Sequence, residues 1–164
     1  MPTYRPFFCV IMSRYTIAKE IFMIITFCGH SDFCLATKYE SFLLTYLKSN
    51  YSDNKIEFYL GGYGAFDSFA YSCAKSFKAF SSNTILTLVV PYLKHNFPTK
   101  NYDYIVYPEL ENIPPKYAIS YRNRFMVDKS DLIIAYVHRN YGGAYSMLKY
   151  AKSKGKRILN LADL

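Results

Sequence analysis

The sequence has no tryptophan, only seven glycines and seven prolines, and four cysteines without a CxxC pair in 164 residues. The low glycine and proline content excludes collagen-like and low-complexity chains, and the scarcity of cysteine excludes a small disulfide scaffold. The spacing of Cys28 and Cys34 is not that of a usual zinc site. We therefore expect no metal, and we interpret the cysteines as small buried side chains in a reducing compartment.

Long hydrophobic runs are also missing. The apolar stretches near the N-terminus are interrupted by Arg14, Lys19 and Glu20, well short of the ~20 apolar residues of a membrane span. The next apolar run, 22–27, leads directly into a predicted core strand, so a signal peptide is disfavoured. We expect no membrane segment and a cytoplasmic location.

What is present is enough for one folded domain. Hydrophobic residues make up 51% and charged residues 20% of the chain, which allows a sizeable core. The 18 tyrosines, together with abundant lysine and asparagine, indicate an AT-rich bacterial or phage genome. The net charge of +8 and the isoelectric point near 9.2 favour anionic partners such as nucleotides or nucleic acid.

The N-terminal segment differs from the rest of the chain. Residues 1–22 show no clear period and contain no glycine, whereas the chain from Met23 onward alternates regularly between strand and helix patterns. We interpret 1–22 as a non-native or disordered extension, with an additional strand or arm as the alternative. Residues 23–164 are predicted to form a single nucleotide-binding domain.

Short apolar, β-branched runs alternate with helical spacings along this domain. We predict strands over 24–28, 55–60, 84–90, 104–107, 131–137 and 156–161, and helices over 37–48, 66–80, 116–129 and 143–153. This alternation is typical of an α/β Rossmann-like three-layer sandwich, with a mostly parallel sheet and helices on both faces.

The glycines are placed where such a sheet binds ligands. All except Gly155 fall between a predicted strand and the following helix: Gly29, Gly61, Gly62, Gly64, Gly142 and Gly143. These junctions share the carboxyl edge of a parallel sheet. Glycine there admits an anion to backbone amides, and the following helix offers unpaired N–H groups. We predict a phosphate-bearing small ligand, with plain turns as the alternative.

The spacing of these glycines matches neither a Walker A loop nor a GxGxxG fingerprint. The sequence therefore disfavours an ATPase or an ordinary NAD dehydrogenase. The ordered set of motifs instead resembles the SLOG superfamily of LOG, Smf/DprA and YpsA-like proteins, most closely the YpsA-like branch. The residues that carry this resemblance are Cys28-Gly29-His30-Ser31, Gly61-Gly62-Tyr63-Gly64-Ala65-Phe66-Asp67, Tyr121 to Asp128 with Ser130-Asp131, and Tyr141-Gly142-Gly143-Ala144.

The resemblance implies a nucleotide pocket at the carboxyl edge of the sheet. In LOG enzymes, a helix Arg four residues before a Met and a Glu late in a PGGxGTxxE motif support cleavage between base and ribose phosphate. Arg122 lies four residues before Met126 and fits the first element. Lys149 stands where the Glu would be, and an ammonium opposes the positive charge that develops on the sugar. The chain is therefore expected to bind rather than to cleave.

The predicted ligand-binding residues come from the three glycine junctions and one helix: Gly29, His30, Ser31, Gly61, Gly62, Tyr63, Gly64, Phe66, Asp67, Arg122, Gly142, Gly143, Ala144 and Tyr145. His30 either donates to the ligand or bonds to the backbone. Asp67 either holds a ribose hydroxyl or only stabilises the first turn of its helix. For Tyr63, Phe66 and Tyr145, base stacking competes with core packing.

Two alternatives stay open. Either Glu109 or Glu111, in a proline-bounded loop, would serve as the nucleophile if the protein were a nucleoside glycosidase or deoxyribosyltransferase working with Arg122. A basic stretch from Lys149 to Arg157 would suit single-stranded nucleic acid, as in Smf/DprA relatives, although a solvated helix face explains most of it.

The leading hypothesis is binding or sensing of a nucleotide-derived small molecule, ADP-ribose-like in kind, without a separate cofactor. The protein would act alone or through contacts in a homo-oligomer, with no membrane partner and with nucleic acid disfavoured.

Overall fold

The computed structural model describes residues 22–34, 37–94 and 99–164. Of the extension predicted over 1–22, all but Phe22 lies outside the described residues. Cys9 falls in the same segment.

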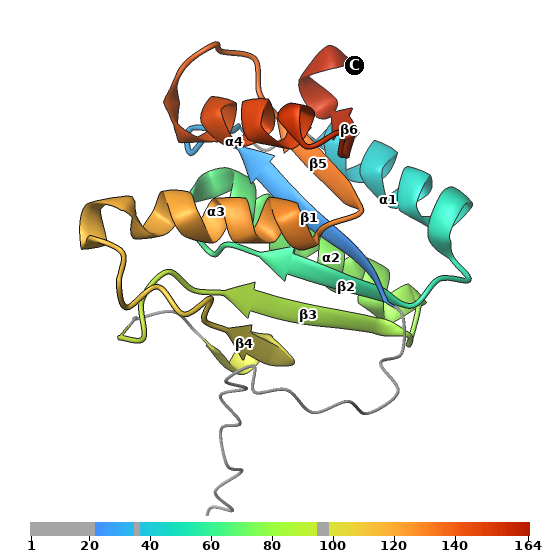
Figure 1. Ribbon diagram of the computed structural model, residues 1–164. Helices are drawn as coiled ribbons and strands as arrows, with labels where there is room; N and C mark the ends of the chain where they lie inside the picture. Colours follow the sequence, from blue (N-terminus) through green and yellow to red (C-terminus); the bar gives the residue numbers. More distant parts are fainter. Residues whose placement is uncertain (1–21, 35–36, 95–98) are drawn as a thin grey trace, which may run out of the picture.

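Six parallel strands form one sheet in the order β4-β3-β2-β1-β5-β6 (Figure 1). The strands are β1 (Met23–Gly29), β2 (Ile56–Leu60), β3 (Thr84–Val89), β4 (Tyr104–Val106), β5 (Leu132–Tyr136) and β6 (Arg157–Asn160). From β1 the chain first builds the sheet outward through β2 to β4 and then adds β5 and β6 on the other side of β1. The strand order therefore reverses between β1 and β5, the place where open α/β sheets bind ligands.

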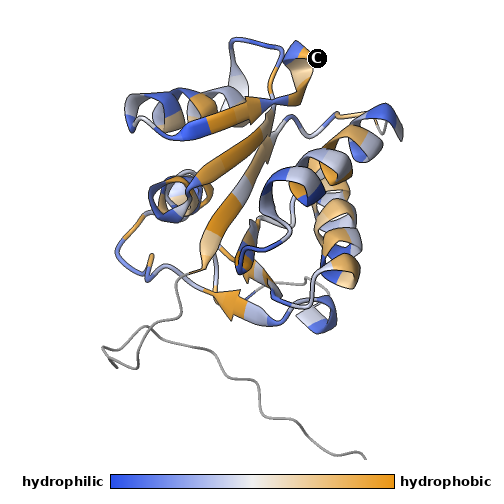
Figure 2. Cartoon of the chain, turned by 90° about the vertical axis from the view of Figure 1, so that its right-hand side faces the viewer, coloured by the Kyte–Doolittle hydropathy of each residue, from blue (hydrophilic) through white to orange (hydrophobic). Residues whose placement is uncertain are grey.

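Helices cover both faces of the sheet. The helices α1 (Thr37–Tyr51) and α2 (Gly64–Phe80) pack on one face, and α3 (Ala118–Lys129) and α4 (Gly142–Ser153) pack on the other. Figure 2 shows the hydrophobic strands enclosed between these helical layers. Short 3-10 turns at Thr99–Asn101, Pro115–Tyr117 and Leu161–Asp163 complete the elements. The α/β Rossmann-like sandwich predicted from the sequence is confirmed.

The burial pattern explains why the helices lie where they do. In α2 the buried residues recur every three or four positions: Phe66, Phe69, Ala70, Cys73, Ala74 and Phe77. This spacing places one apolar stripe against the sheet, where it joins Phe27 and Phe58 in the larger core. The second core lies under α3 and α4 and includes Met126 and Leu148.

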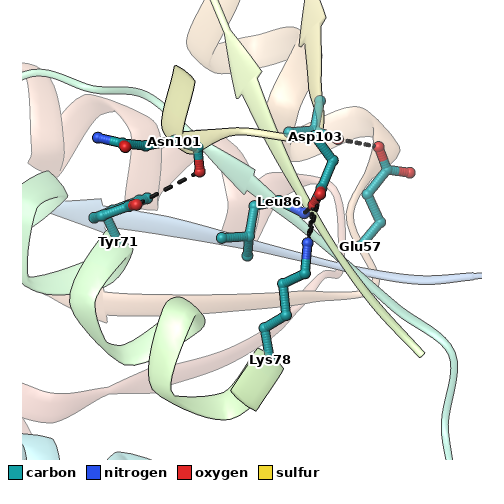
Figure 3. A network of polar contacts seen from close by, with 7 residues as sticks. Glu57, Tyr71, Lys78, Leu86, Asn101 and Asp103 are labelled. Atoms are coloured by element: carbon teal, nitrogen blue, oxygen red, sulfur yellow. Dashed lines mark hydrogen bonds and ion pairs between the residues drawn. The ribbon is translucent and has the colours of Figure 1, made fainter. Parts of the chain in front are cut away.

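The short edge strand β4 pairs with β3, and one carboxylate adds to this attachment. Asp103, just before β4, accepts a hydrogen bond from the Leu86 backbone N–H at 2.7 Å and from Lys78 Nζ at 2.6 Å (Figure 3). Nearby, Thr87 Oγ1 donates to Glu57 Oε1 at 2.6 Å. The edge strand is thereby tied both to β3 and to α2.

The cysteines follow the sequence interpretation only in part. Cys28 and Cys73 are buried and unpaired, whereas Cys34 is exposed. Among the described helices, none is long and apolar enough to cross a membrane.

Candidate ligand-binding site

A cavity lies at the carboxyl edge of the sheet, beside the point where the strand order reverses. It has a volume of about 120 Å³ and is open to solvent. Its walls come from four places: the end of β1 with Gly29, the segment after β2 with Gly61, Tyr63 and, in the first turn of α2, Asp67, the inner face of α3, and the first turns of α4. The end of β1 and the segment after β2 therefore meet the start of α4 at this edge of the sheet.

Two of these junctions need glycine for close approach. A Cβ on Gly61 would lie 2.6 Å from Arg122 Nη1 and 2.8 Å from Asp67 Oδ2. A Cβ on Gly29 would lie 2.2 Å from the ring of Phe66. The absence of a side chain at Gly61 thus leaves room for a cation and a carboxylate at one point of the cavity wall.

Arg122 is the buried cation of the site. Its side chain is only 3% exposed, and Nη1 donates to the carbonyls of Gly61 at 2.8 Å and Val89 at 3.0 Å. The guanidinium also lies 5.5 Å from the centre of the Tyr63 ring. Its buried Nε has no hydrogen-bond partner among the described residues. An unpaired buried donor is costly, so Arg122 is the group of the cavity wall whose hydrogen bonding is incomplete among the described residues.

Asp67 is the carboxylate beside it. Oδ2 accepts a hydrogen bond from the Tyr63 backbone N–H at 2.7 Å. Burial raises the pKa of Asp67 to about 6, although that hydrogen bond and the charge of Arg122 lower it. Asp67 thus stabilises the start of α2 and also lines the cavity. Its binding to a ribose hydroxyl stays a prediction.

The first turn of α4 has free space around its backbone. Gly142 has φ +89°, and a Cβ on either Gly142 or Gly143 would meet no atom within 4 Å. Within the described part of the chain, the N-cap residue Tyr141 makes no side-chain cap hydrogen bond, and the first turn of the helix contains no acidic residue. Ala144 lines the cavity. Free N–H groups and the positive end of the helix dipole are therefore presented to the edge of the site.

His30 and Ser31 lie beside the cavity rather than in its wall. His30 is 4% exposed, and its Nε2 accepts a hydrogen bond from the Arg139 backbone N–H at 3.4 Å. Burial and the nearby charges of Arg139 and His138 lower the pKa of His30. The side chain of Arg139 makes a bidentate pair with Asp32 at 2.9 and 3.0 Å. These contacts join the loop after β1 to the loop after β5.

Ser31 joins the first two loops through its backbone. Its carbonyl accepts a hydrogen bond from Ala65 N at 3.2 Å. A Cβ on Gly64 would lie 3.1 Å from Ser31, and both Gly62 and Gly64 have positive φ. These glycines shape the loop, and neither lines the cavity.

Of the three aromatic residues predicted to bind the ligand, one lines the cavity and two pack in or against the hydrophobic core. Tyr63 lines the cavity and is 40% exposed. Phe66 is 1% exposed, with its ring packed among Phe27, Phe33 and Phe69, so the structure places it in the core. Tyr145 packs against the core under α4 and is not among the lining residues.

The acidic and basic residues of the catalytic alternatives lie elsewhere. Glu109, which has φ 56°, and Glu111 are exposed in the loop before α3, and neither lines the cavity. Lys149 is exposed on α4. Among the described residues, Asp67 is the carboxylate that faces the cavity, and no group of three His, Cys, Asp or Glu residues could hold a metal ion.

The sequence analysis missed the apolar part of the wall. Ile119 and Met147 line the cavity together with Asn123 and Met126. The α3 residues, at positions 119, 122, 123 and 126, have the spacing of one helix face, so this pattern could have identified them. Met147 had no comparable signal, because a Met on a helix facing a sheet is ordinary core composition.

Comparisons with known proteins give matches in structure alone. No family model matches the chain, and no curated protein matches it. DNA processing protein A (DprA) from Streptococcus pneumoniae superposes with a TM-score of 0.59 at 14% identity, over 84% of this chain and 49% of that one. The chain thus spans about half the length of the Streptococcus pneumoniae protein.

Two further structures are similar. DNA processing protein A from Helicobacter pylori, a protein with a single-stranded DNA binding mode, matches with a TM-score of 0.56 at 18% identity, over 83% of this chain and 63% of that one. The structural-genomics target TM1055 matches with a TM-score of 0.54 at 11% identity, over 83% and 72%. This chain therefore has the Rossmann-like fold of these proteins, the fold that the SLOG resemblance implied.

Proposed function

We propose that the protein binds a nucleotide-derived small molecule in the cavity, as a YpsA-like member of the SLOG superfamily. The observation that carries this proposal is that Arg122 and Asp67 both lie against the side-chain-free surface of Gly61 and both line the cavity. A buried cation with an unpaired donor, next to a carboxylate, suits a ligand that has both acceptors and hydroxyl groups.

Each part of the wall suits one part of a nucleotide. The open start of α4 suits a phosphate, since N–H groups and the helix dipole favour an anion there. Asp67 would accept hydrogen bonds from ribose hydroxyls. Ile119, Met126 and Met147 offer an apolar surface for the flat faces of a base, and Tyr63 offers a ring at the rim.

Binding without cleavage is the favoured form of this function. Breaking the bond from base to sugar by the double-carboxylate route requires two carboxyl groups flanking it. Among the described residues the cavity wall supplies Asp67, and Glu109 and Glu111 do not line it. Release of free base from a nucleoside monophosphate by the purified protein would overturn this view.

The decisive experiment is mass spectrometry of the small molecules that co-purify with the full chain, followed by calorimetric titration with AMP. Asp67→Asn should weaken AMP binding at least ~10-fold, because a ribose hydroxyl would lose a charged acceptor. Lys149→Ala is the control, because this exposed lysine lies outside the cavity wall and its variant should bind as the wild type does. Equal affinity in all three proteins would contradict the proposal.

Single-stranded nucleic acid is a second candidate function, favoured by the single-stranded DNA binding mode of the Helicobacter pylori neighbour and by the net charge of +8. Phosphate contacts would release counterions, so affinity for an oligonucleotide should fall steeply with salt. Salt-dependent binding to oligothymidine, without any affinity for AMP, would favour this candidate over the first.

A further inference from the structure

A second hollow opens beside the cavity, between α3 and α4. It has a volume of about 240 Å³ and is also open to solvent. Ile119, Asn123 and Met147 line both hollows, so the cavity and this groove adjoin each other. Both are open to solvent, so a ligand long enough to cross these shared residues could occupy the two together.

The start of α4 lies at the junction of the two hollows. Ala144 faces the cavity, whereas Gly143 and Ser146 line the groove. The first turn of α4, whose N-cap residue Tyr141 makes no side-chain cap hydrogen bond to the described residues, thus lies between the two hollows. A phosphate or diphosphate placed there would leave one substituent in each hollow.

The groove carries its own polar and cationic groups. Lys116 and Arg124 supply positive charge, and Ser120, Asn123 and Ser146 supply groups able to bond with sugar hydroxyls. They are spread over α3, α4 and the turn before α3, which is the layout expected for an extended ligand.

Arg124 is held in position in this groove. Its guanidinium lies 5.6 Å from the Tyr121 ring centre and 5.4 Å from that of Tyr150. The Tyr150 hydroxyl in turn donates to the two carboxylate oxygens of Asp128, at 2.9 and 3.1 Å. Stacking on two rings leaves the N–H groups at the edge of the guanidinium for an acceptor.

We propose that the ligand is a nucleoside diphosphate joined to a second sugar, with its nucleoside in the cavity, its phosphates at the start of α4 and its second sugar in the groove beside Arg124. This inference rests on the proposed function and extends it, because a mononucleotide would leave the groove empty.

The test compares AMP with ADP-ribose on the full chain by calorimetry, in the wild type, Arg124→Ala and Lys129→Ala. Lys129 is an exposed cation of the same helix that lines neither hollow, which makes it a matched control. We expect the wild type and Lys129→Ala to bind ADP-ribose at least ~10-fold more tightly than AMP. Arg124→Ala should lose most of this advantage and keep its affinity for AMP, which also shows that the variant is folded.

The outcomes separate the two proposals. If AMP binds and ADP-ribose binds no more tightly, or if Arg124→Ala weakens both ligands equally, the inference about the groove is wrong and the proposed function stands. If neither ligand binds to the wild type, both proposals fail. Binding of oligothymidine that depends on Arg124, without binding of ADP-ribose, would assign the groove to single-stranded DNA instead and overturn the inference.

Discussion

At the scale of single residues, the site depends on a missing side chain. The wall at Gly61 has room for Arg122 and Asp67 only because no Cβ projects between them. The sequence patterns identified each of these residues separately: Gly61 as a loop glycine, Asp67 as an acid in the first turn of a helix, and Arg122 as a cation on a helix. Their direct proximity could not be predicted, because it depends on how α3 packs across the loop after β2.

Adding one methyl group at Gly61 should therefore damage both fold and site. We expect Gly61→Ala to lower the free energy of unfolding by about 1–3 kcal/mol, since its Cβ would lie 2.6 Å from Arg122 Nη1. Chemical denaturation measures this change. Gly143→Ala is the matched control: its Cβ would meet no atom within 4 Å, and its φ is not positive, so its stability should equal or slightly exceed that of the wild type. Equal stability of the two variants would contradict this account of Gly61.

The Asp67 carboxyl should give the protein a pH dependence of defined sign. Its pKa is about 6 in the fold against an ordinary value of 3.8, so the folded protein binds more protons between these pH values. The free energy of unfolding should thus fall as pH rises through this window, by at most about 3 kcal/mol. Asp67→Asn should lack this contribution. The difference between the two stability curves isolates it, because His30, whose pKa is lowered, contributes with the opposite sign in both proteins.

At the scale of elements, the sequence was most informative for strands and helices and least informative for their ends. All ten predicted strands and helices occur in the structure. The largest difference lies at the end of α1, which continues to Tyr51 instead of ending at residue 48. Before α3, the chain forms a 3-10 turn at Pro115–Tyr117, and the α-helix begins at Ala118. Proline at the start of the turn favours helical dihedrals without supplying a donor, which is compatible with either helix type.

The edge strand β4 should be the element most sensitive to a surface change. Asp103→Ala removes the acceptor for Leu86 N and the partner of Lys78. We expect a loss of about 1–2 kcal/mol in the free energy of unfolding, mainly from the unpaired backbone donor. Hydrogen exchange should rise in β3 and β4 and stay unchanged in β6. Asp163→Ala, at an exposed acid near the C-terminus, serves as the control.

At the scale of the whole molecule, the order of strands and helices in the sequence predicted the architecture. Parallel strands joined by helices leave few other arrangements, and the carboxyl edge then gathers the loops. The identity of the cavity wall was harder to predict, since α3 and α4 contribute ordinary apolar residues. The cytoplasmic location, the homo-oligomer and the bacterial or phage origin stay predictions.

Ligand binding should stabilise the molecule as a whole. A ligand that binds only the folded state at 100 times its dissociation constant adds about 2.7 kcal/mol, which corresponds to roughly 5–10 °C in Tm for a chain of this size. We expect AMP to raise the Tm of the wild type in a concentration-dependent way and to raise that of Asp67→Asn far less. A Tm that does not respond to AMP at millimolar concentration would contradict the proposed site.

The fastening of two loops by Arg139 has a consequence for kinetics. The side chain of Arg139 forms an ion pair with Asp32, and its backbone N–H donates to His30. The loop that leads from β5 to α4 is thus attached to the loop after β1 in the absence of a ligand. These two loops should therefore need little further ordering when a ligand binds. Stopped-flow traces should follow a single exponential whose rate rises linearly with nucleotide concentration, whereas Asp32→Ala should introduce a slower, saturating phase.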